Sequence, residues 1–295
     1  MSKYRYAGRT AIITGGGGDI GSCLAGLLVE RSMNVVIADR NEHAANYVAR
    51  DLGDRALPFA GDLADEAEMV RLLEVTEARF GGLDLLINGI ATTTSERFHS
   101  RSLESIRSEI DITLTAPCIM TRLAVPYLQK SDDPRVITTT SLGGIQPLRE
   151  TPIYTAAKFG LRGAMLSFAL DEELHGIKVG TVAPTATDTQ MLRQEALDDG
   201  NVLNFIDTPQ TALDVARTFL RVLEKPQLEA YPKTSDSILT RLAMLFPNLQ
   251  PRVLPFFERK GRRGMRRYIE DLRKRGLVQE QNGKLVLTPR PERDG

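Results

Sequence analysis

The stretch Thr14-Gly15-Gly16-Gly17-Gly18-Asp19-Ile20-Gly21 joins a short apolar run, residues 10–14, to an amphipathic segment, residues 19–32. A glycine-rich turn between a strand and a helix is typical of sites that bind a dinucleotide. Its glycines let the backbone approach a pyrophosphate, whose charge is stabilised by free N–H groups at the helix N-terminus. Four consecutive glycines also suit a plain structural turn, so the motif needs support from its surroundings.

That support comes from the end of the next apolar run, residues 34–38, which is followed by Asp39. Asp39 lies close to the offset of roughly 20 residues at which an acid can accept a hydrogen bond from a ribose 2′-hydroxyl. Because a carboxylate would repel a 2′-phosphate, we expect NAD as the cofactor. The neighbouring Arg40 can pair with a phosphate, which keeps NADP as the alternative.

From residue 10 to about 187, short apolar runs alternate with longer segments whose apolar residues recur every three or four positions. This alternation is typical of βαβ units in a parallel sheet, and the nearly unbroken apolar runs indicate strands covered on both faces. We predict strands at 10–14, 34–38, 56–60, 83–87, 134–140 and 177–183. We predict helices at 19–32, 42–52, 65–80, 102–130, 153–175 and 208–224, the last capped by Thr208 with Pro209 in its first position.

The composition narrows the class of protein. The chain has 295 residues, 38 Lys+Arg against 38 Asp+Glu, and two cysteines. Zero net charge argues against a protein built mainly to bind nucleic acid. Cys23 and Cys118 are far apart in apolar segments, which favours reduced thiols and a cytoplasmic location. The longest run without a charged residue, 136–148, is too short to span a membrane, and His43, His99 and His175 form no metal set, so we expect no metal.

A second group of polar residues follows the predicted strand 134–140. Ser141 comes directly after this strand, and Tyr154 and Lys158 are four residues apart on the next predicted helix, so they share one face. A lysine ammonium beside a phenol favours its ionised form, and such a tyrosine can exchange a proton with an alcohol. A Tyr-x-x-x-Lys pair alone is common on helix surfaces, but this one lies near the strand edge where open α/β sheets place their ligands.

Together these motifs, in this order, resemble the short-chain dehydrogenase/reductase family over roughly residues 7–225. The resemblance implies a three-layer, doubly wound Rossmann fold with a central, mostly parallel seven-stranded sheet, and therefore a seventh strand near 227–232. We expect residues 1–235 to form one dinucleotide-binding and catalytic domain and residues 236–295 a mainly helical extension. The resemblance also implies a homodimer or homotetramer. Segments 102–130 and 153–175 have apolar residues on more than one face, which suits contact with a second subunit.

The resemblance also implies a role for each matching residue. Tyr154 would be the general acid/base, Lys158 would lower its pKa and hold the nicotinamide ribose, and Ser141 would bind the substrate oxygen. Thr113 stands where the family usually has an asparagine that supports a proton relay, and its hydroxyl can substitute. The expected cofactor-binding residues are Gly15, Gly18, Asp19, Ile20, Gly21, Asp39, Arg40, Asp62, Leu63, Asn88, Tyr154, Lys158, Pro184, Thr187 and Thr189.

Four positions depart from the family pattern, namely Asp19, the run Asn88-Gly89-Ile90-Ala91, Thr185 and Thr113. Asp19 would repel a pyrophosphate unless its side chain points to solvent. Apolar residues that can line the substrate site or simply pack in the core are Phe98, Met191, Leu192, Leu203 and Phe205.

The extension combines apolar residues over 237–257, a basic segment over 252–275, and a hairpin signal at Asn282-Gly283. We expect its apolar residues to pack over the substrate site or a neighbouring subunit while Arg262, Arg263, Arg266 and Arg267 face solvent. The alternative, which we favour less, is contact of residues 252–275, with Phe256-Phe257, with an anionic membrane surface. We expect no nucleic-acid partner, because a complete binding module is absent from the sequence.

Two hypotheses about function follow. The first is an NAD(P)-dependent oxidoreductase that interconverts a secondary alcohol and a ketone by hydride transfer, with Tyr154 as general acid/base. The second is a catalytically weak dinucleotide-binding regulatory or scaffold protein that engages a partner or a membrane surface through its basic C-terminal tail.

Overall fold

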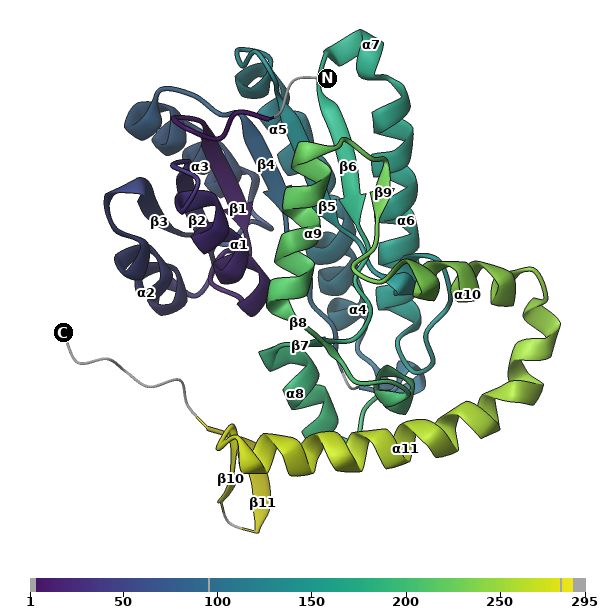
Figure 1. The fold of residues 1–295 in the computed structure, drawn as a ribbon. Helices are drawn as coiled ribbons and strands as arrows, with labels where there is room; N and C mark the ends of the chain where they lie inside the picture. Colours follow the sequence, from purple (N-terminus) through teal and green to yellow (C-terminus); the bar gives the residue numbers. More distant parts are fainter. Residues whose placement is uncertain (1–3, 95, 282, 289–295) are drawn as a thin grey trace.

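The computed structural model describes residues 4–94, 96–281 and 283–288. Its centre is a seven-stranded sheet, in which all the neighbouring strands are parallel, with the order β3-β2-β1-β4-β5-β6-β9 (Figure 1). The sequence prediction of a parallel seven-stranded sheet in an α/β fold is therefore confirmed. The strands are β1 (Thr10–Thr14), β2 (Asn34–Asp39), β3 (Ala56–Ala60), β4 (Leu85–Asn88), β5 (Arg135–Thr139), β6 (Lys178–Val182) and β9 (Glu229–Ala230).

Alternate residues of each strand pack into two separate cores, one on each face of the sheet. Ala11 and Ile13 of β1 contribute to the core under α1 (Asp19–Val29), α2 (Glu42–Leu52) and α9 (Ala212–Glu224). Ile12 contributes to the opposite core, which packs against α3 (Glu66–Phe80), α5 (Ala116–Leu128) and α6 (Pro152–Leu170). Three layers result, as the sequence indicated.

Several predicted helices have different bounds from those expected; α1, for example, ends at Val29 and not at residue 32. The segment 102–130 is divided by a π-helical turn, Asp111–Thr115, between α4 (Leu103–Ile110) and α5. The helix predicted at 208–224 begins only at Ala212, because Thr211 and Asp214 form a capping box and residues 210–211 form β8 (Gln210–Thr211), which pairs with β7 (Thr187–Asp188). The predicted cap at Thr208 is wrong. The segment 153–175 contains α6 and then the short α7 (Glu172–His175).

The C-terminal region is mainly helical, as predicted. It contains α10 (Thr234–Met244), α11 (Gln250–Lys274) and the antiparallel strands β10 (Val278–Gln281) and β11 (Lys284–Leu287). Gln281 pairs with Lys284 across the predicted hairpin, whose turn residue Asn282 lies outside the described residues. Figure 1 shows α11 running beneath the carboxyl ends of the strands, next to α8 (Gln190–Leu197). Within the described ranges, no helix has the length and apolar character that a membrane span requires.

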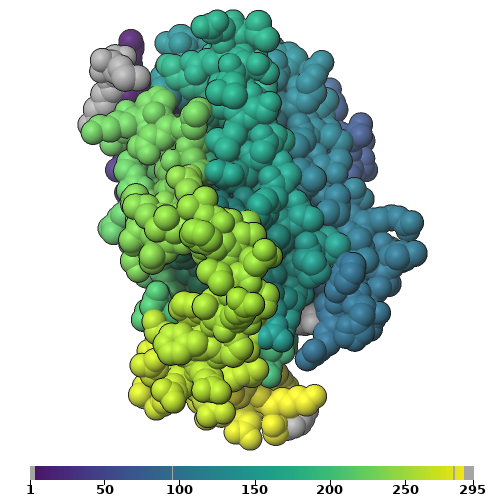
Figure 2. All heavy atoms as spheres, turned by 90° about the vertical axis from the view of Figure 1, so that its right-hand side faces the viewer, coloured from purple at the N-terminus to yellow at the C-terminus, as the bar shows by residue number. Residues whose placement is uncertain are grey.

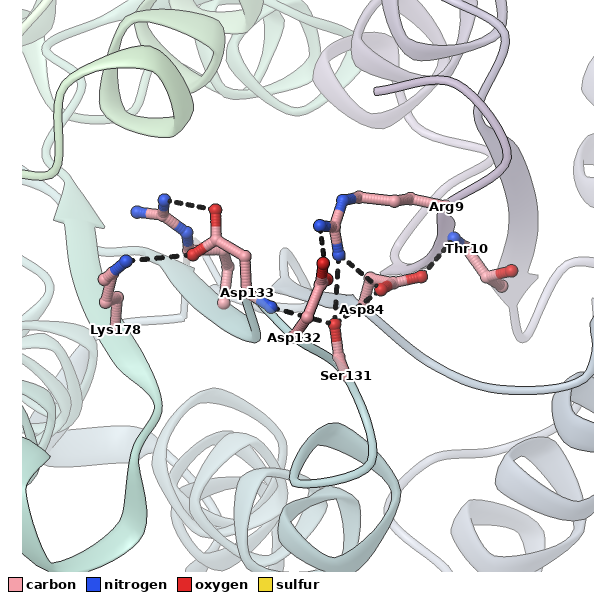
Figure 3. Close-up of polar contacts among 8 residues, drawn as sticks. Arg9, Thr10, Asp84, Ser131, Asp132, Asp133 and Lys178 are labelled. Atoms are coloured by element: carbon pink, nitrogen blue, oxygen red, sulfur yellow. Dashed lines mark hydrogen bonds and ion pairs between the residues drawn. The ribbon is translucent and has the colours of Figure 1, made fainter. Parts of the chain in front are cut away.

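A polar network ties together the amino ends of four strands (Figure 3). It lies at the end of the sheet opposite α11 (Figure 1). Asp84, one residue before β4, accepts hydrogen bonds from the Arg9 guanidinium (2.7 Å), the Ser131 hydroxyl (2.5 Å) and the Thr10 N–H (2.8 Å). Nearby, Asp133 accepts from Arg135 of β5 and from Lys178 of β6. Burial by itself would raise the pKa of Asp133, but these two hydrogen bonds outweigh burial and lower it.

We predict that Asp84→Ala lowers the free energy of unfolding by about 2–3 kcal/mol, since the largely buried Arg9 keeps only Asp132 of its two carboxylate partners and the Thr10 N–H loses its acceptor. Urea denaturation measures the change. The same substitution at the exposed Asp54 is the control and should change stability by less than about 0.5 kcal/mol. An equal effect of the two substitutions would contradict a structural role for this network.

Candidate active site

One cavity of about 410 Å³ lies at the carboxyl ends of the strands. This is where ligands bind in open α/β sheets, and the volume is in the range typical of small-molecule sites. The cavity brings together nearly all the residues that the sequence singled out. Those that line it are Gly15, Gly18, Asp19, Ile20, Gly21, Asp39, Arg40, Asp62, Leu63, Ser141, Tyr154, Lys158, Pro184, Thr187 and Thr189.

The glycine-rich turn has room only for glycine at its crowded positions. Gly15 has a φ of +72°, and a Cβ on Gly21 would lie 2.4 Å from the Gly15 carbonyl oxygen. The close approach of Gly21 lets α1 begin directly at the end of β1. Its first turn therefore points toward the cavity, as a site for an anionic group requires.

From the sequence, Asp19 was expected to point to solvent, because it would otherwise repel a pyrophosphate. In the structure its side chain has a protein partner instead. Its Oδ2 atom accepts a hydrogen bond from the backbone N–H of Gln190 (2.7 Å), the first residue of α8. The N-terminus of α8 is electropositive, so this contact gives the carboxylate a favourable environment. Asp19 thus joins the glycine-rich turn to α8, and both line the cavity.

Asp39 lies at the end of β2 and faces the glycine-rich turn. Its Oδ2 atom accepts a hydrogen bond from the Gly17 N–H (3.1 Å), and its Oδ1 atom accepts one from the Asn41 N–H (3.0 Å). The carboxylate is therefore held in a fixed orientation at one end of the cavity. Arg40 beside it is exposed and also lines the cavity.

Asn88 is not among the residues that line the cavity, contrary to the sequence prediction. Its side chain is buried, and its Nδ2 atom donates to the hydroxyls of Thr121 (2.9 Å) and Thr138 (3.1 Å). Asn88 thereby joins α5 and β5 behind the cavity wall. The next residue must be small, because a Cβ on Gly89 would lie 2.5 Å from the Thr14 carbonyl oxygen. This contact explains the glycine in the Asn88-Gly89 departure from the family pattern.

Ser141, Tyr154 and Lys158 meet at the other end of the cavity, as predicted. The Lys158 side chain is buried, and its Nζ atom donates to the Thr139 carbonyl oxygen (2.9 Å) and lies 5.8 Å from the centre of the Tyr154 ring. Ser141 is placed by the turn after β5, where its Oγ atom accepts a hydrogen bond from the Gly143 N–H (3.0 Å).

Burial sets the protonation of the two titratable groups. It raises the pKa of Tyr154 to about 12, although a hydrogen bond with Ser141 acts in the opposite direction. Burial also lowers the pKa of Lys158 to about 7. Both shifts favour the neutral form, since a charged group is poorly solvated inside the protein. A lysine with a pKa near 7 can gain or lose a proton in the physiological range.

Thr113 was predicted to support a proton relay, but its hydroxyl is used elsewhere. The hydroxyl donates to the Thr92 carbonyl oxygen (3.2 Å) and accepts from the Thr92 N–H (3.1 Å), and Thr113 is not among the lining residues. No hydrogen bond among the described residues joins Thr113 to Lys158. These contacts show that Thr113, in the π-helical turn, positions the loop after β4, and its part in a proton relay stays a prediction.

The remaining predicted residues are held by local contacts. Thr187 in β7 donates to the Thr185 carbonyl oxygen (3.0 Å), and Thr189 caps α8 by accepting from the Leu192 N–H. The Pro184 carbonyl oxygen accepts from the Leu142 N–H, which links this loop to the turn after Ser141. Asp62 accepts from the Ala64 N–H (3.0 Å), and Leu63 is buried.

Three polar residues that the sequence analysis missed also line the cavity: Glu195, Asn201 and Asn204. The Glu195 Oε1 atom accepts from the Asn201 N–H (3.1 Å) and from Asn204 Nδ2 (2.9 Å). Asn201 is only 4% exposed, and its Nδ2 atom has no hydrogen-bond partner among the described residues. Burial raises the pKa of Glu195. The charge of Glu195 also contributes to the raised pKa of Tyr154, after burial, which is the largest cause.

The C-terminal extension supports this polar part of the cavity from outside. Gly261 and Gly264 of α11 let the helix backbone approach the turn 202–205, where a Cβ on Gly261 would lie 2.2 Å from the Val202 carbonyl oxygen. Phe205 packs against Tyr268 of α11 in a separate small core. Of the five apolar residues proposed as a substrate wall, only Met191 and Leu192 line the cavity.

In the described part of the chain, no cluster of His, Cys, Asp or Glu is arranged to hold a metal ion. Cys23 and Cys118 are free thiols, and burial raises the pKa of each. Neither cysteine is among the residues that line the cavity.

Comparison with known proteins places the chain in a family. Residues 9–200 match the short chain dehydrogenase family. The chain is 32% identical, over 195 residues, to a 2,5-dichloro-2,5-cyclohexadiene-1,4-diol dehydrogenase of Sphingobium indicum, covering 65% of this chain and 78% of that protein. It is 30% identical, over 206 residues, to an uncharacterised oxidoreductase of Thermotoga maritima, covering 69% and 80%. The chain belongs to the short-chain dehydrogenase family of oxidoreductases.

Two solved structures share the fold. One is a 3-ketoacyl-(acyl-carrier-protein) reductase from Brucella melitensis in complex with NADH, with a TM-score of 0.68, 23% identity, and coverage of 78% of this chain and 99% of that chain. The other is a 7α-hydroxysteroid dehydrogenase in complex with NADH and 7-oxo glycochenodeoxycholic acid, with a TM-score of 0.67, 24% identity, and coverage of 75% and 89%. They confirm the Rossmann-type fold that the sequence predicted.

We predict that Lys158→Met stabilises the fold more at pH 6 than at pH 9, by about 3 kcal/mol. The folded lysine releases its proton near pH 7, whereas the unfolded lysine keeps it until its ordinary pKa of 10.5. The unfolded state therefore binds more protons between these values, and the cost of burying Lys158 falls as the pH rises. Urea denaturation at both pH values tests this, with the exposed Lys225→Met as control. An equal effect at the two pH values would contradict the lowered pKa.

Proposed function

We propose that this protein is an NAD-dependent oxidoreductase that interconverts a secondary alcohol and a ketone by hydride transfer. The observation that carries the proposal is that one cavity has the glycine-rich turn and Asp39 at one end and Ser141, Tyr154 and Lys158 at the other. A cavity of this kind suits an extended dinucleotide whose reactive ring lies beside a proton donor.

The residues present fit a nicotinamide dinucleotide. The crowded glycines let α1 begin directly at the cavity, where a helix N-terminus suits a pyrophosphate, and Asp39 is oriented to accept hydrogen bonds from a ribose. The carboxylate of Asp39 would repel a 2′-phosphate, which favours NAD over NADP. Asp62 and Leu63 would contact the adenine, and Thr187 and Thr189 the nicotinamide side.

A nicotinamide dinucleotide held by these residues would supply the hydride acceptor in oxidation and the hydride donor in reduction. In the oxidation direction, Tyr154 takes the proton of the substrate hydroxyl, while Ser141 donates a hydrogen bond to the same oxygen. Lys158, 5.8 Å from the Tyr154 ring, favours the ionised phenol whenever it carries its proton. Since burial alone keeps Tyr154 protonated, we propose that the positive charges of Lys158 and the oxidised cofactor together lower its pKa.

We further propose that the substrate carries a second hydroxyl group. A hydroxyl both donates and accepts a hydrogen bond, and the cavity offers one group of each kind in Glu195 and Asn201. The Oε2 atom of Glu195 accepts no hydrogen bond from the described residues, and the buried Nδ2 atom of Asn201 lacks an acceptor. An unpaired buried donor is costly, so a ligand that satisfies it gains affinity. The relative from Sphingobium indicum is named as a diol dehydrogenase.

We predict that Tyr154→Phe lowers kcat/KM by at least about a hundredfold, because it removes the proton acceptor, whereas binding of NADH changes by less than about threefold. Initial rates and NADH fluorescence titration measure the two quantities. Retention of full activity would contradict the assigned role. Loss of NADH binding with intact folding would also contradict it, because Tyr154 would then serve binding and not proton transfer.

We predict that Glu195→Gln lowers kcat/KM for cyclohexane-1,4-diol about ten- to a hundredfold more than for cyclohexanol, since a hydrogen bond to a charged group contributes about 1.5–3 kcal/mol. The control is Glu172→Gln, an exposed position on α7, which should affect both alcohols equally and slightly. An equal loss for both alcohols in Glu195→Gln would contradict recognition of a second hydroxyl, without bearing on the role of Tyr154.

A further inference from the structure

The helix α10 exposes three large apolar residues and buries two of its polar residues. Ser237 and Thr240 are buried and donate to backbone carbonyl oxygens within the helix, whereas Ile238, Leu239 and Leu242 are 53–67% exposed. This orientation is the reverse of that expected for a helix on the surface of a protein surrounded by water. The outward face therefore suits an apolar environment.

The apolar surface continues from α10 onto the first half of α11. It comprises nine of the 17 large apolar side chains that are exposed in the described part of the chain, all within twenty residues. We call this surface the apolar strip: Ile238, Leu239, Leu242, Leu245, Phe246, Leu249, Val253, Phe256 and Phe257. Figure 2 shows these yellow-green segments together on one face of the molecule, and Figure 1 shows them projecting from the body as an arm. Scattered apolar residues are ordinary, but a contiguous surface of this kind marks an interaction site.

Basic residues continue the same face of α11. From Leu249, Val253 and Phe256 the helical spacing of three and four residues leads to Lys260, Arg263 and Arg267, all of them exposed. Along this helix as a whole there are nine Lys/Arg and three Asp/Glu. The opposite face, with Gly261, Met265, Tyr268 and Leu272, packs against the protein. One half of the exposed face is thus apolar and the other half positively charged.

We propose that the apolar strip and the adjoining basic residues dock this protein on an anionic lipid bilayer. Apolar side chains would enter the interface between headgroups and acyl chains, and the arginines would lie on the negatively charged headgroups. A second copy of the chain fits this face less well. Antiparallel pairing of α11 would set Arg263 and Arg267 against apolar side chains, and parallel pairing would set the arginines against each other.

The proposal corrects part of the sequence-based expectation for the extension. One face of α11 packs against the rest of the protein, as expected. The four arginines of this helix that were expected to face solvent are exposed: Arg262, Arg263, Arg266 and Arg267. The apolar residues 238–257, however, were expected to pack, and most of them are exposed. Docking is independent of the catalytic proposal, because none of these residues lines the cavity.

Sedimentation of the purified full-length protein with vesicles tests the proposal. We expect binding to vesicles of phosphatidylcholine with phosphatidylglycerol, much weaker binding to phosphatidylcholine alone, and release at high salt. Arg263→Gln with Arg267→Gln should weaken binding to anionic vesicles roughly 25-fold, at roughly fivefold for each basic side chain. Leu242→Ser with Phe246→Ser should weaken it on the order of tenfold or more.

The matched control is Leu170→Ser with Leu174→Ser, which changes two exposed apolar residues outside the apolar strip and should leave binding unchanged. Circular dichroism checks that each variant is folded. Absence of vesicle binding by the native chain would overturn the proposal, as would an equal effect of the control pair. Sedimentation velocity gives a further contrary outcome: a native dimer that Leu242→Ser with Phe246→Ser dissociates, without vesicle binding, would show that the apolar strip pairs with a second copy.

Discussion

The close approach of backbone segments at the carboxyl end of β1 is the constraint on which the rest of the site depends. A Cβ on Gly21 would meet the Gly15 carbonyl at 2.4 Å, and one on Gly89 would meet the Thr14 carbonyl at 2.5 Å. These two contacts fix where α1 begins and how the loop after β4 leaves the sheet. The N-terminus of α1, Asp39 and the loop 89–93 can therefore line one cavity, which then extends to Tyr154 and Lys158.

The sequence predicted the strands and the residues whose placement follows from strand ends. The strand-end rule predicted the positions of Asp39 and Ser141, and helical periodicity predicted that Tyr154 and Lys158 share one face. All four line the cavity. Asn88 also ends a strand, but its side chain bonds to Thr121 and Thr138 behind the wall, and side-chain direction at a strand end depends on packing that a single sequence does not show. The contact of Thr113 was not foreseen for a similar reason, since its partner is the backbone of Thr92, which only the folded chain brings near. Glu195 and Asn201 come from a segment without clear periodicity, and the turn 202–205 that follows Asn201 packs against the distant helix α11, which a single sequence does not show.

The C-terminal extension contributes both to the proposed substrate site and to the proposed membrane-docking surface. Its inner face, through Gly261 and Gly264, supports the turn that carries Asn201 and Asn204. Its outer face carries the apolar strip and the arginines. The family match ends at residue 200, so the turn and the helix that packs on it both lie beyond the matched region.

The most direct test of the account is whether the cavity binds the expected cofactor in the expected orientation. Thermal unfolding of the native chain would be followed during titration with NADH and, separately, with NADPH. The account predicts that NADH raises the unfolding temperature in a saturable manner and that NADPH raises it far less, because the 2′-phosphate would meet the carboxylate of Asp39. Stabilisation by NADPH alone, or by neither dinucleotide, would contradict the central claim.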